Sequence, residues 1–435
     1  MADPLLDSLL APGPAPTRAA PAWLDAARRQ AREALVREGL PGARNEAWKY
    51  TSLRALAQRR YMPGDAQAAT RNLERGLADL PGLGDARLVF ANGVFRADLS
   101  RLPEAAGLVV EPLADALADA DGLARASFER RFDDPAQVFA RLNTALADDG
   151  FVLRVAPGAR VAEPVHVVVL GAGAQALAWN LRLVVELGAG SALTLVEHHA
   201  GEADDAQLGN VVAEFALGAG ARLDLLQLQV AAESATRIRR SAFTLAADAV
   251  LNLRTLELGG ALARHDLVVG LDGDRARLTS RGVFVVRARQ HSDTRLDVRH
   301  RARDTACDLV WRGVASGRAR GVLHGAITVD PGADGTDASL DTKNLLLSAQ
   351  AEIDVQPVLE IHADEVKAAH GATVGQLDER ALFYLRTRGL PEAEARALLT
   401  LAFCRVAVDT LENVALREHV DALLLERLPV HGEPA

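Results

Sequence analysis

The chain has 435 residues, of which 49% are hydrophobic and 25% are charged, a composition typical of a globular protein with about two or three domains. It contains no apolar run of roughly 18 residues, and its start lacks a secretory signal pattern, so we expect neither a membrane span nor export. The net charge of −9 argues against nucleic-acid binding, and two cysteines are too few for a disulfide framework, which predicts a cytoplasmic protein.

The N-terminal part of the chain is predicted to be mostly helical. Residues 1–20 are rich in Pro and Ala without a sustained period, which predicts a flexible lead-in to an N-terminal domain over 21–148. Apolar residues at three- and four-residue spacing predict a helix over 22–38 that ends at Gly39. Later in this domain, Asn92-Gly93 between two apolar runs predicts a hairpin, because both residues tolerate positive φ.

The middle of the chain has the sequence pattern of β-strands. Between about 150 and 366, short runs of β-forming residues alternate with Gly, Asp and Pro, and helical periodicity disappears. A weak repeat supports stacked units of two or three strands each. This pattern predicts a β-helix or related solenoid as the core over 149–372, with a two-sheet sandwich as the alternative. The repeats begin at Leu187, Leu217, Leu245 and Leu271, which are 30, 28 and 26 residues apart.

The last part of the chain, 373–435, is predicted to be a helical domain. Asp378 is suited to cap a first helix that ends at Gly389. We expect a second helix from Pro391 to about Arg417, followed by an amphipathic piece over 420–428. Such helices could cover the open end of a stack of strands or bind a partner.

Histidines and carboxylates form several clusters that suit zinc or iron. Glu360, His362 and Asp364 are two apart, so on a strand they would share one face. A solvent-facing polar stripe is the alternative reading of these residues. The other clusters are Glu197-His198-His199 and Gln290-His291-Ser292-Asp293 with His300.

The cysteines and the paired acids separate two kinds of function. Iron–sulfur clusters are commonly held by four thiolates, whereas this chain has only Cys307 and Cys404, so alone it should not hold a cluster and would lend at most one or two ligands. A stand-alone β-helix enzyme acting on polysaccharide is the alternative, because paired carboxylates serve glycoside cleavage. The pairs in question are Asp272 with Asp274 and Asp293 with Asp297.

Three segments resemble the SufB/SufD family of iron–sulfur cluster assembly proteins, and its SufD members in particular. Residues 46–51, Glu-Ala-Trp-Lys-Tyr-Thr, resemble an E-x-WKYT segment near the start of those proteins, and 290–293 resemble their Q-H-x-D stretch. The longest match is ungapped and covers 321–388. All three lysines of the chain, Lys49, Lys343 and Lys367, lie within these matching segments.

The resemblance implies a fold and partners. It implies a right-handed parallel β-helix between an N-terminal helical region and a C-terminal helical domain. It also implies a scaffold without catalysis of its own, which pairs with SufB through the β-helix and binds the ABC-type ATPase SufC through its C-terminal helices. A homodimer is plausible for the isolated chain, because the edges of a solenoid invite partners.

The resemblance also implies a site for iron. His370 matches a family histidine associated with iron binding or cluster assembly at the SufB interface, and a structural histidine at the edge of the solenoid is the alternative reading. His362 is a second, weaker candidate, and it stands where the family commonly has a tyrosine. The family cysteine two residues before that histidine is Ala368 here, so His370 or groups on SufB must supply the ligands. We therefore expect no cofactor bound tightly by this chain alone, and a transient iron–sulfur cluster or iron in the complex.

Overall fold

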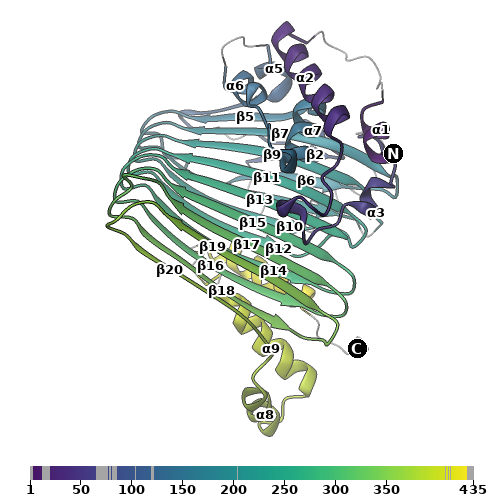
Figure 1. Cartoon of the computed structure of the whole chain (residues 1–435), viewed down its shortest axis with the longest axis vertical. Coiled ribbons are helices and arrows are strands. Elements are labelled where there is room, and N and C mark those ends of the chain that lie inside the picture. Colours follow the sequence, from purple (N-terminus) through teal and green to yellow (C-terminus); the bar gives the residue numbers. More distant parts are fainter. Residues whose placement is uncertain are drawn as a thin grey trace.

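The core of the protein is a parallel β-solenoid in which consecutive strands alternate between two sheets (Figure 1). This computed structural model describes residues 3–11, 20–64, 77, 80, 86–102, 104–118, 122–202, 204–406, 408–409, 411 and 413–428. The solenoid strands of sheet A are β5 (Asp149–Val155), β7 (Leu177–Leu187), β9 (Leu208–Leu217), β11 (Thr236–Leu245), β13 (Leu262–Leu271), β15 (His291–His300), β17 (Arg320–Val329) and β19 (Glu352–Ile361). Those of sheet B are β6 (Val165–Gly171), β8 (Ala192–Gly201), β10 (Arg222–Val230), β12 (Val250–Glu257), β14 (Arg277–Val286), β16 (Ala306–Ala315), β18 (Asp337–Leu346) and β20 (Lys367–Gly375).

The weak sequence repeat corresponds to one turn of this solenoid. The four repeat leucines end successive strands of sheet A and pair with one another in register, so they form one ladder. Each is followed by a tight turn into sheet B with one residue at positive φ, which is glycine at Gly190 and Gly220 (φ 68° and 66°). The prediction of stacked units of two or three strands is therefore confirmed, with two strands in each turn. The sandwich alternative is wrong, because same-sheet neighbours from β5 to β20 run parallel.

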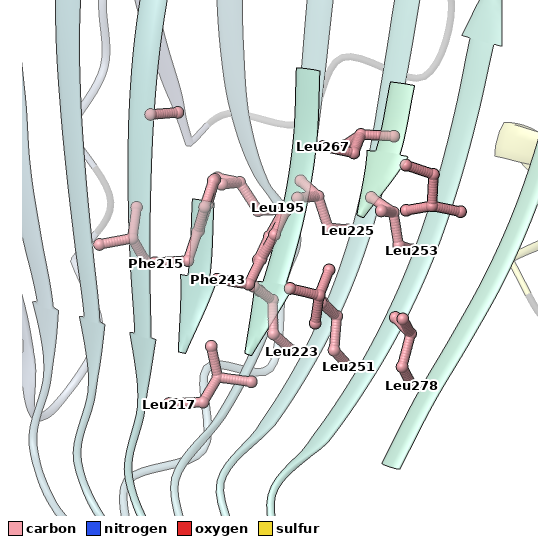
Figure 2. Close-up of a cluster of buried hydrophobic side chains, with 14 of the residues drawn as sticks. Leu195, Phe215, Leu217, Leu223, Leu225, Phe243, Leu251, Leu253, Leu267 and Leu278 are labelled. Carbon is pink, nitrogen blue, oxygen red and sulfur yellow. The ribbon is translucent and has the colours of Figure 1, made fainter. Parts of the chain in front are cut away.

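Inward-facing side chains of both sheets make the main core. Figure 2 shows leucines and phenylalanines from the two sheets pointing toward one another between the strands. Phe215 and Phe243, on neighbouring strands, stack with ring centroids 4.6 Å apart. Because each turn supplies the same ladder positions, every turn buries its apolar side chains against the next, and the hydrophobic effect stabilises the stack as a whole.

The N-terminal region packs mainly on the outer face of sheet A. Side chains of α2 (Ala22–Glu38) and α7 (Val138–Leu146) share apolar clusters with outward residues of β7, β9 and β11. The expected hairpin is present as β2 (Arg87–Ala91) and β3 (Val94–Phe95), which extend sheet B. The remaining elements here are α1 (Pro4–Leu9), η1 (Glu46–Trp48), α3 (Arg54–Ala57), β1 (Met62–Pro63), β4 (Leu108–Pro112), α5 (Leu113–Ala116), α6 (Leu123–Glu129) and η2 (Pro135–Gln137).

One part of the expected flexible lead-in is packed instead. Asp3 caps α1 with its side chain, and Leu5 and Leu6 are buried among the N-terminal helices. This short helix was not predicted because the segment 1–20 as a whole is rich in Pro and Ala and has no sustained period. Residues 1–2 and 12–19 of the predicted lead-in lie outside the described residues.

The C-terminal helices α8 (Glu379–Thr387), α9 (Glu392–Arg405) and α10 (Val414–Arg427) follow the last strand. The prediction of one long second helix is wrong, because α9 ends at Arg405 and the side chain of Asn413 caps a new helix. α10 packs on the outer face of sheet B, whereas Figure 1 shows α8 beyond the last strands, away from the sheets. In the part of the chain that the structure describes, no helix is long and apolar enough to cross a membrane.

Candidate functional site

The end of the solenoid formed by β19 and β20 is open. Each of these strands is the last in its sheet and, within the described strands, pairs with one neighbour only, β17 and β18 respectively. β20 is exposed along almost its whole length. Their outer edges therefore present backbone donors and acceptors to whatever docks there, which is the usual means by which one sheet continues into another.

His370 lies on β20 at this open end, where the hydrophobic core stops. On β20 it pairs in register with Leu340 of β18, and the same ladder continues inward through buried positions of sheet B. No further turn covers His370, so its side chain is exposed. A polar imidazole thus occupies a ladder position that leucine occupies in most earlier turns. The buried positions of this ladder are Leu195, Leu225, Leu253, Ser280, Leu309 and Leu340.

His362 also lies at the open end of the solenoid, but in a turn rather than on a strand. β19 stops at Ile361, so His362 and Asp364 belong to the turn before β20. The prediction that they share one strand face with Glu360 is therefore wrong, because the alternation of a strand does not extend through the turn. Among the described residues, no group of three or more His, Cys, Asp or Glu side chains is arranged to hold a metal ion.

The Glu197-His198-His199 cluster is buried within the solenoid, and His199 lines a cavity there together with Arg239. Glu197 and His199 point inward, where Glu197 forms an ion pair with Arg239. Burial opposes the charge of Glu197, but Arg239 and His199 outweigh it and lower its pKa to about 2. Glu197 is therefore held in an ion pair inside the protein, while its second carboxylate oxygen has no hydrogen-bond partner among the described residues.

His198 points outward from sheet B and is covered by α10. Its Nε2 lies 3.0 Å from Nδ1 of His166 on β6, and its ring lies 6.2 Å from that of His419 on α10. Burial, followed by the neighbouring histidines, lowers the pKa of His198 to about 3, and burial lowers that of His166 to about 4. These imidazoles are therefore neutral at neutral pH.

Two segments singled out in the sequence meet on the outer face of sheet A. Residues 46–51, called the strap from here on, cross β13 and β15. The Thr51 hydroxyl donates to Asp293 (2.5 Å) and lies 2.9 Å from Nε2 of His291. The indole of Trp48 is buried, and the guanidinium of Arg264 lies 3.9 Å from the ring centre. These contacts hold the strap to the solenoid, a role that the sequence did not reveal.

Asp293 is consequently engaged in structure. It accepts from Arg264 (2.6 Å) as well as from Thr51, and it is almost fully buried. Asp272 forms an exposed ion pair with Arg301 at a turn. One carboxylate of each acid pair is therefore engaged with an arginine.

Both thiols are buried in apolar surroundings. Cys307 faces the main core, where its sulfur lies 3.3 Å from Nε2 of His300, and Cys404 lies between α9 and sheet B. Burial raises the pKa of each thiol to about 12, so both are protonated and poor metal ligands at neutral pH.

Comparison with known proteins identifies the relatives of this chain. Residues 169–403 match the family described as "SUF system FeS cluster assembly, SufBD core domain", and 17–167 match the SufBD N-terminal region. The chain is 30% identical to the iron–sulfur cluster assembly protein SufD of Escherichia coli, over 91% of both chains. It is 27% identical to a SufBD family protein of Synechocystis, over 87% of this chain and 85% of the relative. A SufBD family protein of Mycobacterium tuberculosis is 29% identical over 90% of each.

Proposed function

Because the chain belongs to the SufBD family of iron–sulfur cluster assembly proteins, we propose that it is a non-catalytic scaffold subunit of a SufB–SufC–SufD complex. The open end of the solenoid, with His370 at its mouth, carries this proposal. An iron site there is incomplete without a partner, which is what a scaffold that assembles a cluster between two chains requires. A cytoplasmic location is part of the same proposal.

SufB is the proposed partner at the open end. A related solenoid would dock its own last strands against β19 and β20, so the unpaired edges of both proteins become buried. Iron would then bind between the chains, with His370 as the ligand from this side and His362 as a second candidate. Neutral imidazole is a suitable ligand for iron, whereas the buried thiols of this chain are not available.

SufC is the proposed partner of the protruding helices. Phe383 and Tyr384 on α8 are 68% and 56% exposed, and Leu398 on α9 is also exposed. Large apolar side chains gathered on a projecting helix pair are typical of a docking surface. Since α10 and the second half of α9 pack on sheet B, the docking surface comprises α8 and the first half of α9 rather than the whole C-terminal segment.

The experiment that tests the proposal uses the full chain co-expressed with SufB and SufC. We expect the three proteins to co-purify and the complex to contain iron and acid-labile sulfide. His370→Ala should lower both without dissociating the complex, whereas Thr373→Ala, an exposed change on the same strand, should not. Retention of full iron and sulfide by His370→Ala would remove this histidine from the site. Failure to co-purify would refute the scaffold role itself.

A further inference from the structure

A cavity of about 290 Å³ opens beside the strap, between α3 and the turns that enter sheet A. We call it the strap pocket. Three positively charged side chains line it, together with a histidine and hydroxyl groups, and none of its described lining residues is acidic. The residues that matter here are Lys49, Tyr50, Ser52, Arg59, His291 and Arg320.

Two of the cations gather around one aromatic ring. The ammonium of Lys49 lies 5.3 Å from the ring centre of Tyr50, and the guanidinium of Arg320 lies 5.8 Å from the same centre. Arg320 also forms ion pairs with Asp354 (2.7 Å) and Glu352 (3.5 Å), and Lys49 lies 3.8 Å from Glu46. These carboxylates do not line the cavity. Carboxylates just outside the cavity therefore neutralise part of the charge of Lys49 and Arg320, and Arg59 is the remaining cation of the wall.

The other polar groups of the pocket are held by the strap. Thr51 fixes His291, and burial lowers the pKa of this histidine, so the positive charge of the pocket comes from Lys49, Arg59 and Arg320. The Tyr50 hydroxyl accepts a hydrogen bond from Gln356 of β19 (3.2 Å), which leaves its own proton available to an acceptor. The Ser52 side chain is exposed at the rim.

We infer that the strap pocket binds a small anion that bears a phosphate group. The guanidinium of Arg59 presents parallel donors that match phosphate oxygens, whereas Nε and Nη2 of Arg320 already donate to Asp354. The ammonium of Lys49 adds a compact charge, and hydroxyl groups supply further donors. The volume lies at the small end of the range for ligand cavities, which suits a single phosphate or a mononucleotide rather than a dinucleotide. Nothing in the proposed assembly of iron–sulfur clusters requires this pocket, so the inference stands apart from it.

Isothermal titration calorimetry on the full-length chain at constant ionic strength tests this inference. Inorganic phosphate and adenosine monophosphate are the probes, and they distinguish free phosphate from phosphate carried by a nucleotide. We expect one site, weakened at least about tenfold by Lys49→Gln and by Arg59→Gln. The matched control is Lys367→Gln, an exposed lysine on β20 outside the pocket, which should bind as the unaltered chain does. Thermal melts establish that all three variants are folded.

Three results would overturn the inference. The first is the absence of binding by both probes at millimolar concentration. The second is an equal loss in Lys367→Gln, which would show a general charge effect. The third is full competition by an equal concentration of sulfate, which would show that the pocket does not select phosphate. Tighter binding of the nucleotide than of phosphate would support the inference and identify the source of the phosphate.

Discussion

At the scale of single residues, the buried histidines between sheet B and α10 make stability depend on pH. His166 and His198 have pKa values of about 4 and 3 in the folded protein, compared with 6.5 for an unperturbed histidine. Below about pH 6.5 both histidines become protonated in the unfolded chain but stay neutral in the folded chain, so acidification favours unfolding. Stability should be fully present above pH 6.5 and should fall as the pH approaches 4.

We expect the pair to cost about 5 kcal/mol of unfolding free energy between pH 7 and 4.5, since each histidine contributes about 1.4 kcal/mol per pH unit below pH 6.5. Urea unfolding measured across this range checks the prediction. The double variant His166→Leu/His198→Leu should flatten the pH dependence, because it removes both imidazoles and leaves neither without its partner. His362→Gln, an exposed histidine, serves as the control. Equal slopes in the double variant and the control would contradict the assignment.

The sequence pointed to several of the right residues but not to their environments. Alternation along β8 places Glu197 and His199 on one face and His198 on the other. Because α10 covers the outer face of sheet B, both faces of β8 are buried. The pattern of polar and apolar residues therefore could not show which of these side chains face the core and which face α10. The contact between Thr51 and Asp293 joins positions 242 apart, and it depends on where the strap crosses the stacked strands. No local pattern encodes that crossing.

At the scale of elements, each turn that follows a repeat leucine contains one residue in the left-handed backbone conformation, and the residue type differs between turns. Gly220 occupies it in one turn, and Asp248 in the next with φ of 60°. A side chain at Gly220 would meet nothing closer than the Gly190 backbone at 4.0 Å, so a substitution there tests conformation alone.

We expect Gly220→Val to lower the free energy of unfolding by about 1–3 kcal/mol, because a β-branched residue is strained at positive φ. Gly220→Asn should cost less, since asparagine adopts this conformation more readily. Ala219→Val, at the exposed neighbouring position, is the control. Chemical denaturation of the three variants gives the comparison, and equal losses in the valine and asparagine variants would show that the turn does not impose the strain.

The cover on sheet B offers a second test at this scale. Leu424 of α10 is fully buried against the sheet cluster, whereas the adjacent Leu425 is 46% exposed. Leu424→Ala should lower the free energy of unfolding by about 2–5 kcal/mol, the usual cost of emptying a buried leucine site, and Leu425→Ala should cost much less. Thermal or urea unfolding distinguishes the two. Similar losses would mean that α10 does not pack as a fixed cover.

Elements differed in how far the sequence predicted them. The helix over 22–38 begins and ends as expected because its period is regular and Gly39 stops it with φ of 66°. The solenoid was predicted because a repeat with tight turns leaves no room for crossover helices. The end of α9 was missed because apolar spacing continues past Arg405, and the cap of α10 at Asn413 was overlooked.

At the scale of the whole molecule, the two ends of the stack differ. At the N-terminal end, the short strand β4 pairs antiparallel with the outer edge of β5 and is the last strand of sheet A. Helices cover the nearby faces of this sheet. At the other end, β19 and β20 form the last turn, and α10 covers the outer face of sheet B without closing the stack. Self-association should therefore use the C-terminal end of the solenoid.

Each end exposes one valine on an edge strand, which gives a matched pair of substitutions. Val374 lies on β20 and is 47% exposed, and Val109 lies on β4 and is 54% exposed. We expect the isolated chain to form a dimer in sedimentation equilibrium. Val374→Lys should weaken the dimer by at least about tenfold in dissociation constant, because a charge on an edge strand opposes pairing. Val109→Lys should leave it unchanged. A monomer at all concentrations, or a dimer that only Val109→Lys disrupts, would contradict an interface at the open end and with it the geometry proposed for SufB.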